Sequence, residues 1–251
     1  MVSLNPMGEL LFAHMSIISL KNVSKIYRTA VGESLAALDN VNLEVEKGEF
    51  VAVVGESGSG KTTLLNMIGG LDQPTEGSVL VDGHNITSAG DKELSRFRNR
   101  SIGFIFQSFH LQPLQTATAN VMVPLLFTET TWSEARKKAE ASLGLVGLSD
   151  KVNQRVNQLS AGQCQRVAIA RAIVNNPRIL LADEPTGNLD VRTGTEIINQ
   201  LKQINTNHSA TILLVTHEED VAAQARRIIT IQAGRIVSDA ALGAGSNEDR
   251  Q

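Results

Sequence analysis

A glycine-rich segment, residues 55–62, reads GESGSGKT and lies between an apolar run at 50–54 and a periodic stretch at 64–68. This order predicts a buried strand, a tight turn and a helix. The glycines let backbone N–H groups turn inward around a polyphosphate, and the N-terminus of the following helix adds positive potential. A chance match in a glycine-rich loop is the alternative, and the flanking strand and helix argue against it. We therefore expect the chain to fold around this unit and to bind a nucleoside triphosphate.

Two residues at the end of this loop are suited to phosphate chemistry. Lys61 can reach the β- and γ-phosphates, which makes it a candidate catalytic residue, and the Thr62 hydroxyl can ligate Mg²⁺. We assign nucleotide binding to nine consecutive residues: Gly55, Glu56, Ser57, Gly58, Ser59, Gly60, Lys61, Thr62 and Thr63.

The composition limits the partners of the chain. With 251 residues and 42% hydrophobic content, it can bury one large core. A net charge of -3 gives no basic field that would steer the chain onto nucleic acid, so we expect no nucleic-acid partner. Cys164 is the only cysteine, which excludes an intrachain disulfide and a metal–cysteine cluster. A membrane-spanning helix needs about 20 consecutive apolar residues. The apolar stretches here are shorter, so we expect a chain that is soluble by itself.

The two ends of the chain differ in pattern from the middle. Residues 1–14 lack the basic start of a signal peptide, and we interpret them as an N-terminal extension. Translation from Met15 is an alternative start that the sequence leaves open. Residues 241–251 are small, polar and aperiodic, which predicts a disordered tail. The folded domain is therefore expected over residues 15–240.

The first part of the chain has the two-residue period of half-buried strands. Apolar residues alternate at 17–23 and 41–45, and Asp82-Gly83 is suited to a tight hairpin turn. These patterns predict a small antiparallel sheet beside the nucleotide-binding core.

The rest of the chain alternates strands and helices. Short β-branched runs at 102–106, 179–182 and 211–215 predict a mostly parallel sheet. Residues 108–170 predict an inserted helical subdomain, in which Thr131 and Glu134 form a capping box. We therefore expect an α/β fold with three parts.

Two adjacent carboxylates, Asp183 and Glu184, follow the apolar run 179–182. They would lie at the C-terminal end of a buried strand, where open α/β sheets bind ligands. Asp183 can hold the Mg²⁺ shell, and Glu184 can orient or deprotonate the attacking water. An acidic pair in this position is usually a solvated turn. The phosphate-binding loop in the same chain favours the functional interpretation.

A second candidate anion site is LSAGQ, residues 159–163, which precedes an amphipathic helical pattern. Ser160 would cap this helix, and the N-terminus would offer N–H groups and a positive dipole end to a phosphate. An ordinary capped helix is the alternative.

These motifs together resemble the ATP-binding cassette (ABC) family. The glycine-rich loop, LSAGQ, the run ILLADE at 179–184, GNLD at 187–190 and His217 occur in the order and spacing of that family. The resemblance covers about residues 15–237. It implies a P-loop NTPase fold with a RecA-like parallel core, binding of ATP and Mg²⁺, and ATP hydrolysis. It also implies a homodimer in which LSAGQ of one chain contacts the γ-phosphate held by the other.

The resemblance further implies roles that spacing alone does not provide. Gln107 corresponds to the glutamine that senses Mg²⁺ and the attacking water, and His217 to the γ-phosphate contact. The remaining assignments are Tyr27 to adenine stacking, Ser160, Gly162 and Gln163 to the clamp, and Asp190 to the loop between the dimer's two sites. Together with Lys61, the residues Gln107, Glu184 and His217 are the candidate catalytic residues. The candidate metal ligands are Thr62, Gln107 and Asp183.

One position departs from the family pattern, because LSAGQ stands where LSGGQ is usual. Ala161 is tolerated if its φ is helical or extended and strained if its φ is positive. We expect activity to survive.

A narrower resemblance, carried by EPTGNLD at 184–190 and FIFQSFHLQP at 104–113, is to the lipoprotein-release and macrolide-export branch. It implies an ATPase subunit at the inner face of the cell membrane that energises a separate permease for export or lipid extraction. The segment 111–127 either receives a coupling helix of the permease or is a packed subdomain helix. Two other functions remain open: an ATP-dependent module that gates a membrane partner without moving a solute, and a P-loop kinase in which residues 159–163 have no role.

Overall fold

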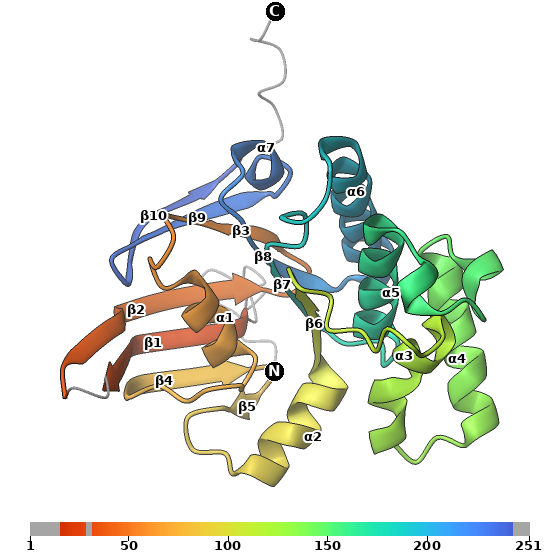
Figure 1. The fold of residues 1–251 in the computed structure, drawn as a ribbon. Helices are drawn as coiled ribbons and strands as arrows, with labels where there is room; N and C mark the ends of the chain where they lie inside the picture. Colours follow the sequence, from red (N-terminus) through yellow and green to blue (C-terminus); the bar gives the residue numbers. More distant parts are fainter. Residues whose placement is uncertain (1–15, 29–31, 243–251) are drawn as a thin grey trace, which may run out of the picture.

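The strands form two sheets that lie beside one another (Figure 1). The computed structural model describes residues 16–28 and 32–242. The four-stranded antiparallel sheet has the order β2-β1-β4-β5, with β1 Ser16–Arg28, β2 Ser34–Glu46, β4 Glu76–Val81 and β5 His84–Asn85. The six-stranded sheet has the order β10-β9-β3-β8-β7-β6, with β3 Phe50–Val54, β6 Ile102–Phe106, β7 Ile179–Asp183, β8 Thr211–Val215, β9 Arg227–Gln232 and β10 Arg235–Ala241.

The helices divide between the two faces of the six-stranded sheet. α1 contacts strands of both sheets and lies between them, whereas α5 and α6 cover the opposite face (Figure 1). The α-helices are α1 Lys61–Ile68, α2 Asp91–Ser101, α3 Ala117–Met122, α4 Trp132–Leu145, α5 Ala161–Ile173, α6 Val191–His208 and α7 Glu219–Ala222. The short 3₁₀ helices are η1 Val123–Phe127, η2 Ser149–Lys151 and η3 Val156–Gln158.

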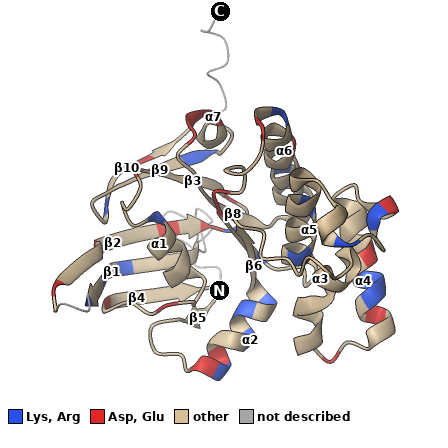
Figure 2. Ribbon diagram, in the orientation of Figure 1, with Lys and Arg blue, Asp and Glu red and all other residues tan. Residues whose placement is uncertain are grey.

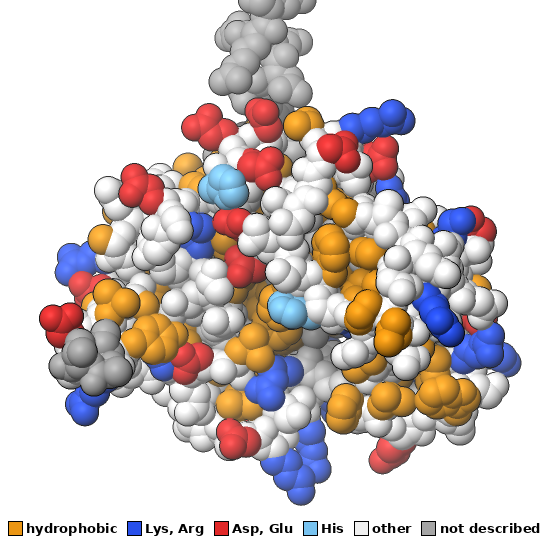
Figure 3. Space-filling model, in the orientation of Figure 1, with side chains coloured by type: hydrophobic (Ala, Val, Ile, Leu, Met, Phe, Trp, Pro, Cys, Tyr) orange, Lys and Arg blue, Asp and Glu red, His pale blue; other side chains and the backbone are white. Residues whose placement is uncertain are grey.

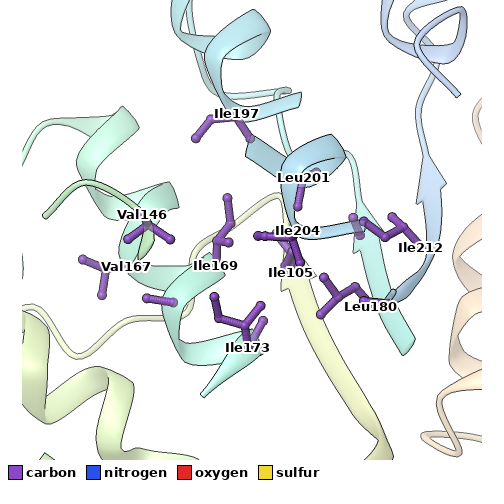
Figure 4. Close-up of a cluster of buried hydrophobic side chains, with 14 of the residues drawn as sticks. Ile105, Val146, Val167, Ile169, Ile173, Leu180, Ile197, Leu201, Ile204 and Ile212 are labelled. Carbon is purple, nitrogen blue, oxygen red and sulfur yellow. The ribbon is translucent and has the colours of Figure 1, made fainter. Parts of the chain in front are cut away.

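Alternation along the central strands creates two hydrophobic cores. In β7, Leu180 and Ala182 pack with the helices α5 and α6, whereas Ile179 and Leu181 point to the opposite core with α1 and the antiparallel sheet. Figure 4 shows the first core, where Leu180 and Ile105 lie among Ile169 and Ile173 of α5 and Leu201 of α6. Because successive side chains of a strand face opposite sides, a continuous apolar run satisfies both cores. This explains why the central strands β3, β7 and β8 are almost continuously apolar.

The sheet topology places the candidate site. Strands β3, β9, β8, β7 and β6 are parallel, and β8 lies between β3 and β7. Parallel strands bring their carboxyl ends to one edge of the sheet. The loop after β3, the acidic pair at the end of β7 and the segments after β6 and β8 therefore meet at the same edge.

Several local predictions are confirmed. Asp82 and Gly83 form the turn between β4 and β5, and Val81 pairs with His84. Thr131 and Glu134 form the capping box of α4. The α/β fold with an antiparallel sheet and a helical region is as expected.

Other boundaries and elements differ from the prediction. β10 continues to Ala241, so the prediction of a tail from residue 241 is wrong at its first residue. The rest of that tail, the extension 1–14 and the alternative start Met15 lie outside the described residues. The segment 91–101 was not predicted to be helical, yet it forms α2.

Within residues 16–28 and 32–242, every helix is too short or too polar to cross a lipid bilayer.

Candidate functional site

The glycine-rich loop connects β3 to α1 and is closed around the Lys61 side chain. The Lys61 Nζ donates hydrogen bonds to the carbonyl oxygens of Gly55, at 2.8 Å, and Glu56, at 2.7 Å. Gly60 has a φ of 108°, and a β-carbon there would collide with the carbonyl of Ala37. The Ser59 hydroxyl is buried and has no hydrogen-bond partner. A buried cation, an unpartnered hydroxyl and an exposed loop backbone fit a polyphosphate ligand.

The first residue pair beside the loop joins α1 to β7. The Thr62 Oγ1 lies 3.1 Å from Asp183 Oδ2, although the two residues are 121 positions apart in the sequence. Burial raises the pKa of Asp183, and the charge of Glu184 adds to this effect, while Thr62 and Lys61 oppose it. A partly buried carboxylate beside a hydroxyl provides hard oxygen ligands of the kind that Mg²⁺ prefers. Thr62 and Asp183 therefore fit the metal site that the sequence predicts.

A second pair joins β7 to β8. His217 Nδ1 lies 3.1 Å from Glu184 Oε1, and the Glu184 side chain is 24% exposed against 61% for His217. Glu184 has a φ of 45°, a left-handed conformation that is uncommon for a residue other than glycine. The carboxylate is therefore held at the rim of the loop with the imidazole outside it, where each could contact a bound phosphate or water.

Gln107 follows β6 and packs against the turn after Glu184. The Asn188 Nδ2 donates a 2.9 Å hydrogen bond to the carbonyl oxygen of Gln107. A β-carbon at Gly187 would come within 2.7 Å of Gln107 Nε2, so the absence of a side chain at Gly187 leaves space for this amide. The half-buried guanidinium of Arg171 in α5 donates to the carbonyls of Phe109 and His110 and so holds the segment after Gln107.

Tyr27 lies at the end of β1, and its ring orientation is fixed by two neighbours. Its hydroxyl donates a 2.8 Å hydrogen bond to Asp72 Oδ2, and Lys25 Nζ lies 4.9 Å from the ring centroid. Lys25 also forms a 2.6 Å ion pair with Asp72. Burial and the hydrogen bond to Asp72 raise the pKa of Tyr27. The ring is 37% exposed, which leaves part of it open to a stacking partner.

The LSAGQ residues form a separate group at the start of α5. Ser160 and Gln163 make a reciprocal capping box, with Ser160 Oγ accepting from Gln163 N at 3.3 Å. Ala161 is the first helical residue and is not among the non-glycine residues with positive φ. The alanine is therefore unstrained, as the helical alternative predicted.

The same group includes the start of α6. A β-carbon at Gly162 would come within 2.5 Å of Thr193 Cγ2. Asp190 caps α6 by accepting hydrogen bonds from the Thr193 backbone, at 3.1 Å, and from its hydroxyl, at 2.6 Å. Gly162 and Asp190 are thus joined through Thr193, which the sequence analysis did not single out.

Apart from Tyr27, the predicted catalytic, metal-binding and clamp residues therefore form two groups. The first, called the loop site here, contains Lys61, Thr62, Gln107, Asp183, Glu184 and His217. The second, called the capped-helix site, contains Ser160, Gly162, Gln163 and Asp190. Among the described residues, no hydrogen bond or ion pair joins a member of the capped-helix site to a member of the loop site.

A broad cleft of about 1180 Å³ opens between α2 and η1. One wall is basic and the other apolar, since Arg96 and Arg100 of α2 face Val123, Pro124 and Phe127. Lys and Arg recur along α2 in Figure 2, and Figure 3 shows apolar side chains exposed on the helical side of the molecule. Within the segment 111–127, Ala117, Val121, Met122 and Leu125 pack into the hydrophobic core, while Leu114, Val123, Leu126 and Phe127 are exposed. Residues 117–127 therefore form the two short helices α3 and η1, which pack into the core on one side and have an exposed apolar edge on the other.

The parallel sheet with its phosphate-binding loop and acidic strand end defines a P-loop NTPase. A family model described as ABC transporter matches residues 38–187. The chain belongs to the ABC transporter family, and within it to the ATP-binding ATPase domains.

Individual relatives agree with this assignment. The uncharacterized ABC transporter ATP-binding protein YknY of Bacillus subtilis is 47% identical over 88% of this chain and 95% of its own length. The macrolide export ATP-binding/permease protein MacB of Nitrosomonas europaea is 44% identical over 89% of this chain, which spans only 34% of that longer protein.

A solved structure also matches over nearly the whole chain. It is a dimeric structure of a post-hydrolysis state of the ATP-binding cassette MJ0796 bound to ADP and Pi, with a TM-score of 0.83 and 45% identity, and it covers 91% of this chain and all of that one. The ABC transporter ATP-binding protein MJ0796 from Methanocaldococcus jannaschii is 48% identical to this chain, over 88% of this chain and 95% of its own length.

Proposed function

We propose that this chain is the Mg²⁺-dependent, ATP-hydrolysing subunit of an ABC transporter, with residues 15–240 as its ATPase domain. The observation that carries the proposal is the loop site, where Lys61, the Thr62–Asp183 pair and the Glu184–His217 pair meet at one edge of the parallel sheet. Phosphate-binding, metal-binding and water-activating groups are thus supplied together.

Each side chain of the loop site has a role in this proposal. Lys61 exchanges its bonds to the loop carbonyls for phosphate oxygens, and Thr62 and Asp183 hold the Mg²⁺ ion. When bound, this ion neutralises negative charge on the phosphates. Glu184 accepts a proton from the attacking water, His217 contacts the γ-phosphate, and Gln107 orients the water. Tyr27 stacks on the adenine.

The capped-helix site completes the proposal by acting on a second chain. Its helix N-terminus offers N–H groups to a γ-phosphate. It would thus stabilise negative charge there without an arginine side chain inserted into the site. Because the site is separate from the loop site of its own chain, we propose a head-to-tail homodimer in which Ser160, Gly162 and Gln163 contact the partner's nucleotide. The structure of MJ0796, which is a dimer bound to ADP and Pi, supports the dimer.

The walls of the cleft and the names of the relatives support a permease as the membrane partner. A permease segment with an apolar side and acidic residues would match the apolar wall at Phe127 and the basic wall at Arg96 and Arg100. This would place the chain on the cytoplasmic face of the cell membrane. The name of the macrolide export relative supports export as the driven process. Extraction of a lipid or lipoprotein is the other process that the resemblance carried by EPTGNLD implies.

The variant Glu184→Gln tests the proposal. It keeps the size of the side chain but removes the base, so we expect ATP binding to persist and kcat to fall about 10²- to 10⁴-fold. With MgATP the variant should elute as a dimer in size-exclusion chromatography with light scattering. Hydrolysis at the wild-type rate would remove Glu184 from the base role. A monomer at saturating MgATP would contradict the dimer.

A further inference from the structure

Gln165 is a buried residue of α5 with an unusual hydrogen-bond balance. Its exposed fraction is 0%, and its Nε2 donates a 2.7 Å hydrogen bond to the carbonyl oxygen of Pro185. Its Oε1 is buried and has no hydrogen-bond partner. A buried acceptor without a partner is destabilising, and an apolar side chain of similar size would avoid it. Packing alone therefore does not explain a glutamine at this position.

The acceptor of this bond lies directly after Glu184. Glu184 holds a φ of 45°, although a residue before proline normally adopts an extended conformation. Two backbone bonds hold Glu184 itself: its N–H donates to the Val215 carbonyl at 3.0 Å, and its carbonyl accepts from the Gly187 N–H at 3.1 Å. The bond from Gln165 is the contact that fixes the next carbonyl, from outside the turn.

We propose that Gln165 is a positioning residue for Glu184. By fixing the Pro185 carbonyl, it keeps the turn in the left-handed conformation that directs the Glu184 carboxylate toward His217. This inference rests on the proposed role of Glu184 as the base. A small rotation of the turn would displace the carboxylate from the attacking water, and such displacements reduce turnover more than binding.

The position of Gln165 also connects the two sites. Ser160 and Gln163 cap the same helix, α5, so the element that would contact the partner's nucleotide also supports the base of its own chain. Closure of the dimer would therefore act on Glu184 through one buried hydrogen bond.

The experiment compares Gln165→Met with the control Gln200→Met. Gln200 lies in α6, has a buried Oε1 without a partner and belongs to neither site. Each substitution removes one unpartnered acceptor. Gln165→Met also removes the hydrogen bond to the buried Pro185 carbonyl, which destabilises the fold. The removal of the unpartnered Oε1 stabilises it, so the two effects partly offset each other. We expect kcat to fall about 10- to 100-fold in Gln165→Met, with the KM for ATP and the affinity for a fluorescent ATP analogue unchanged. Gln200→Met should keep the wild-type kcat.

The outcomes separate this inference from the proposed function. A wild-type kcat in Gln165→Met would overturn the positioning role, while Glu184→Gln would still test the base. An equal fall of kcat in both methionine variants would also overturn it, because it would indicate a general packing effect. If Gln165→Met does not fold, as judged by circular dichroism, Gln165→Ala replaces it, since alanine favours the helix and leaves room for water at the Pro185 carbonyl. The same selective fall in kcat is then expected.

Discussion

At the scale of single residues, two features of the loop site lower the stability of the folded chain and suit the proposed chemistry. Asp183 is a partly buried carboxylate whose pKa is raised mainly by burial, and Glu184 adopts a left-handed backbone conformation. Both features oppose folding when no nucleotide is bound, and both are expected where ligand binding compensates them.

The variant Asp183→Asn tests this cost. Because the pKa of Asp183 is raised in the folded state, the folded chain holds the proton more tightly, and stability falls as pH rises from the unfolded pKa, about 3.9, through the raised folded pKa. Asparagine removes this loss and can still accept from Thr62. At pH 7 without nucleotide or metal, we expect a Tm that is higher by at most about 2–4 °C, since partial exposure keeps the energy below about 1 kcal/mol.

Differential scanning calorimetry at pH 7 and near pH 4 checks this prediction. The difference in Tm should shrink at the lower pH, and the gain in Tm that MgATP gives to the wild type should be lost in the variant. A variant that is less stable than the wild type at pH 7 without ligands would contradict it.

At the scale of elements, two helices carry the same capping box in different settings. Ser160 and Gln163 cap α5 at the capped-helix site, and Thr131 and Glu134 cap α4 on the helical side of the molecule. In both, one side-chain oxygen satisfies a backbone N–H that the helix leaves without a partner. Only the first is proposed to contact a nucleotide.

Ser160→Ala and Thr131→Ala therefore form a matched pair. Each should lose about 1 kcal/mol of unfolding free energy with the loss of the cap. Only Ser160→Ala should also lower kcat, by about tenfold, because it removes a charge-stabilising contact to the partner's phosphate. Urea denaturation and steady-state ATPase assays separate the two effects. Unchanged turnover in Ser160→Ala would contradict a role of this helix end in hydrolysis.

Elements differ in how far the sequence alone could predict them. The capping box of α4 and the turn at Asp82-Gly83 depend on neighbouring residues, and both were predictable from spacing. α2 was missed because Leu94 and Phe97 are its only buried apolar residues, too few to show a helical period. The contacts of Tyr27 with Asp72 and of Gln165 with Pro185 join residues 45 and 20 positions apart, and local patterns carry no information about such pairs.

At the scale of the whole molecule, the cleft between α2 and η1 is the surface suited to a membrane partner. It joins a basic wall to an apolar edge where Phe127 is 77% exposed. Exposed apolar patches with a polar rim are typical of protein interfaces.

Phe127→Ser tests this surface. We expect it to reduce co-purification of the co-expressed permease about tenfold or more, because a buried aromatic anchor contributes more than 1 kcal/mol to an interface. Val237→Ser is the control, since Val237 is 56% exposed on β10 and does not line the cleft. Equal retention of the permease by both variants would exclude the cleft as the contact.

The separation of the capped-helix site from the loop site has a consequence for the cell. In the proposed dimer each nucleotide site is completed by the partner's helix, so a subunit without a second copy would not hydrolyse ATP. A permease that binds two copies side by side would then control where and when ATP is hydrolysed. On this proposal, the position of one helix N-terminus would make ATP hydrolysis a property of the assembled transporter and not of the free subunit.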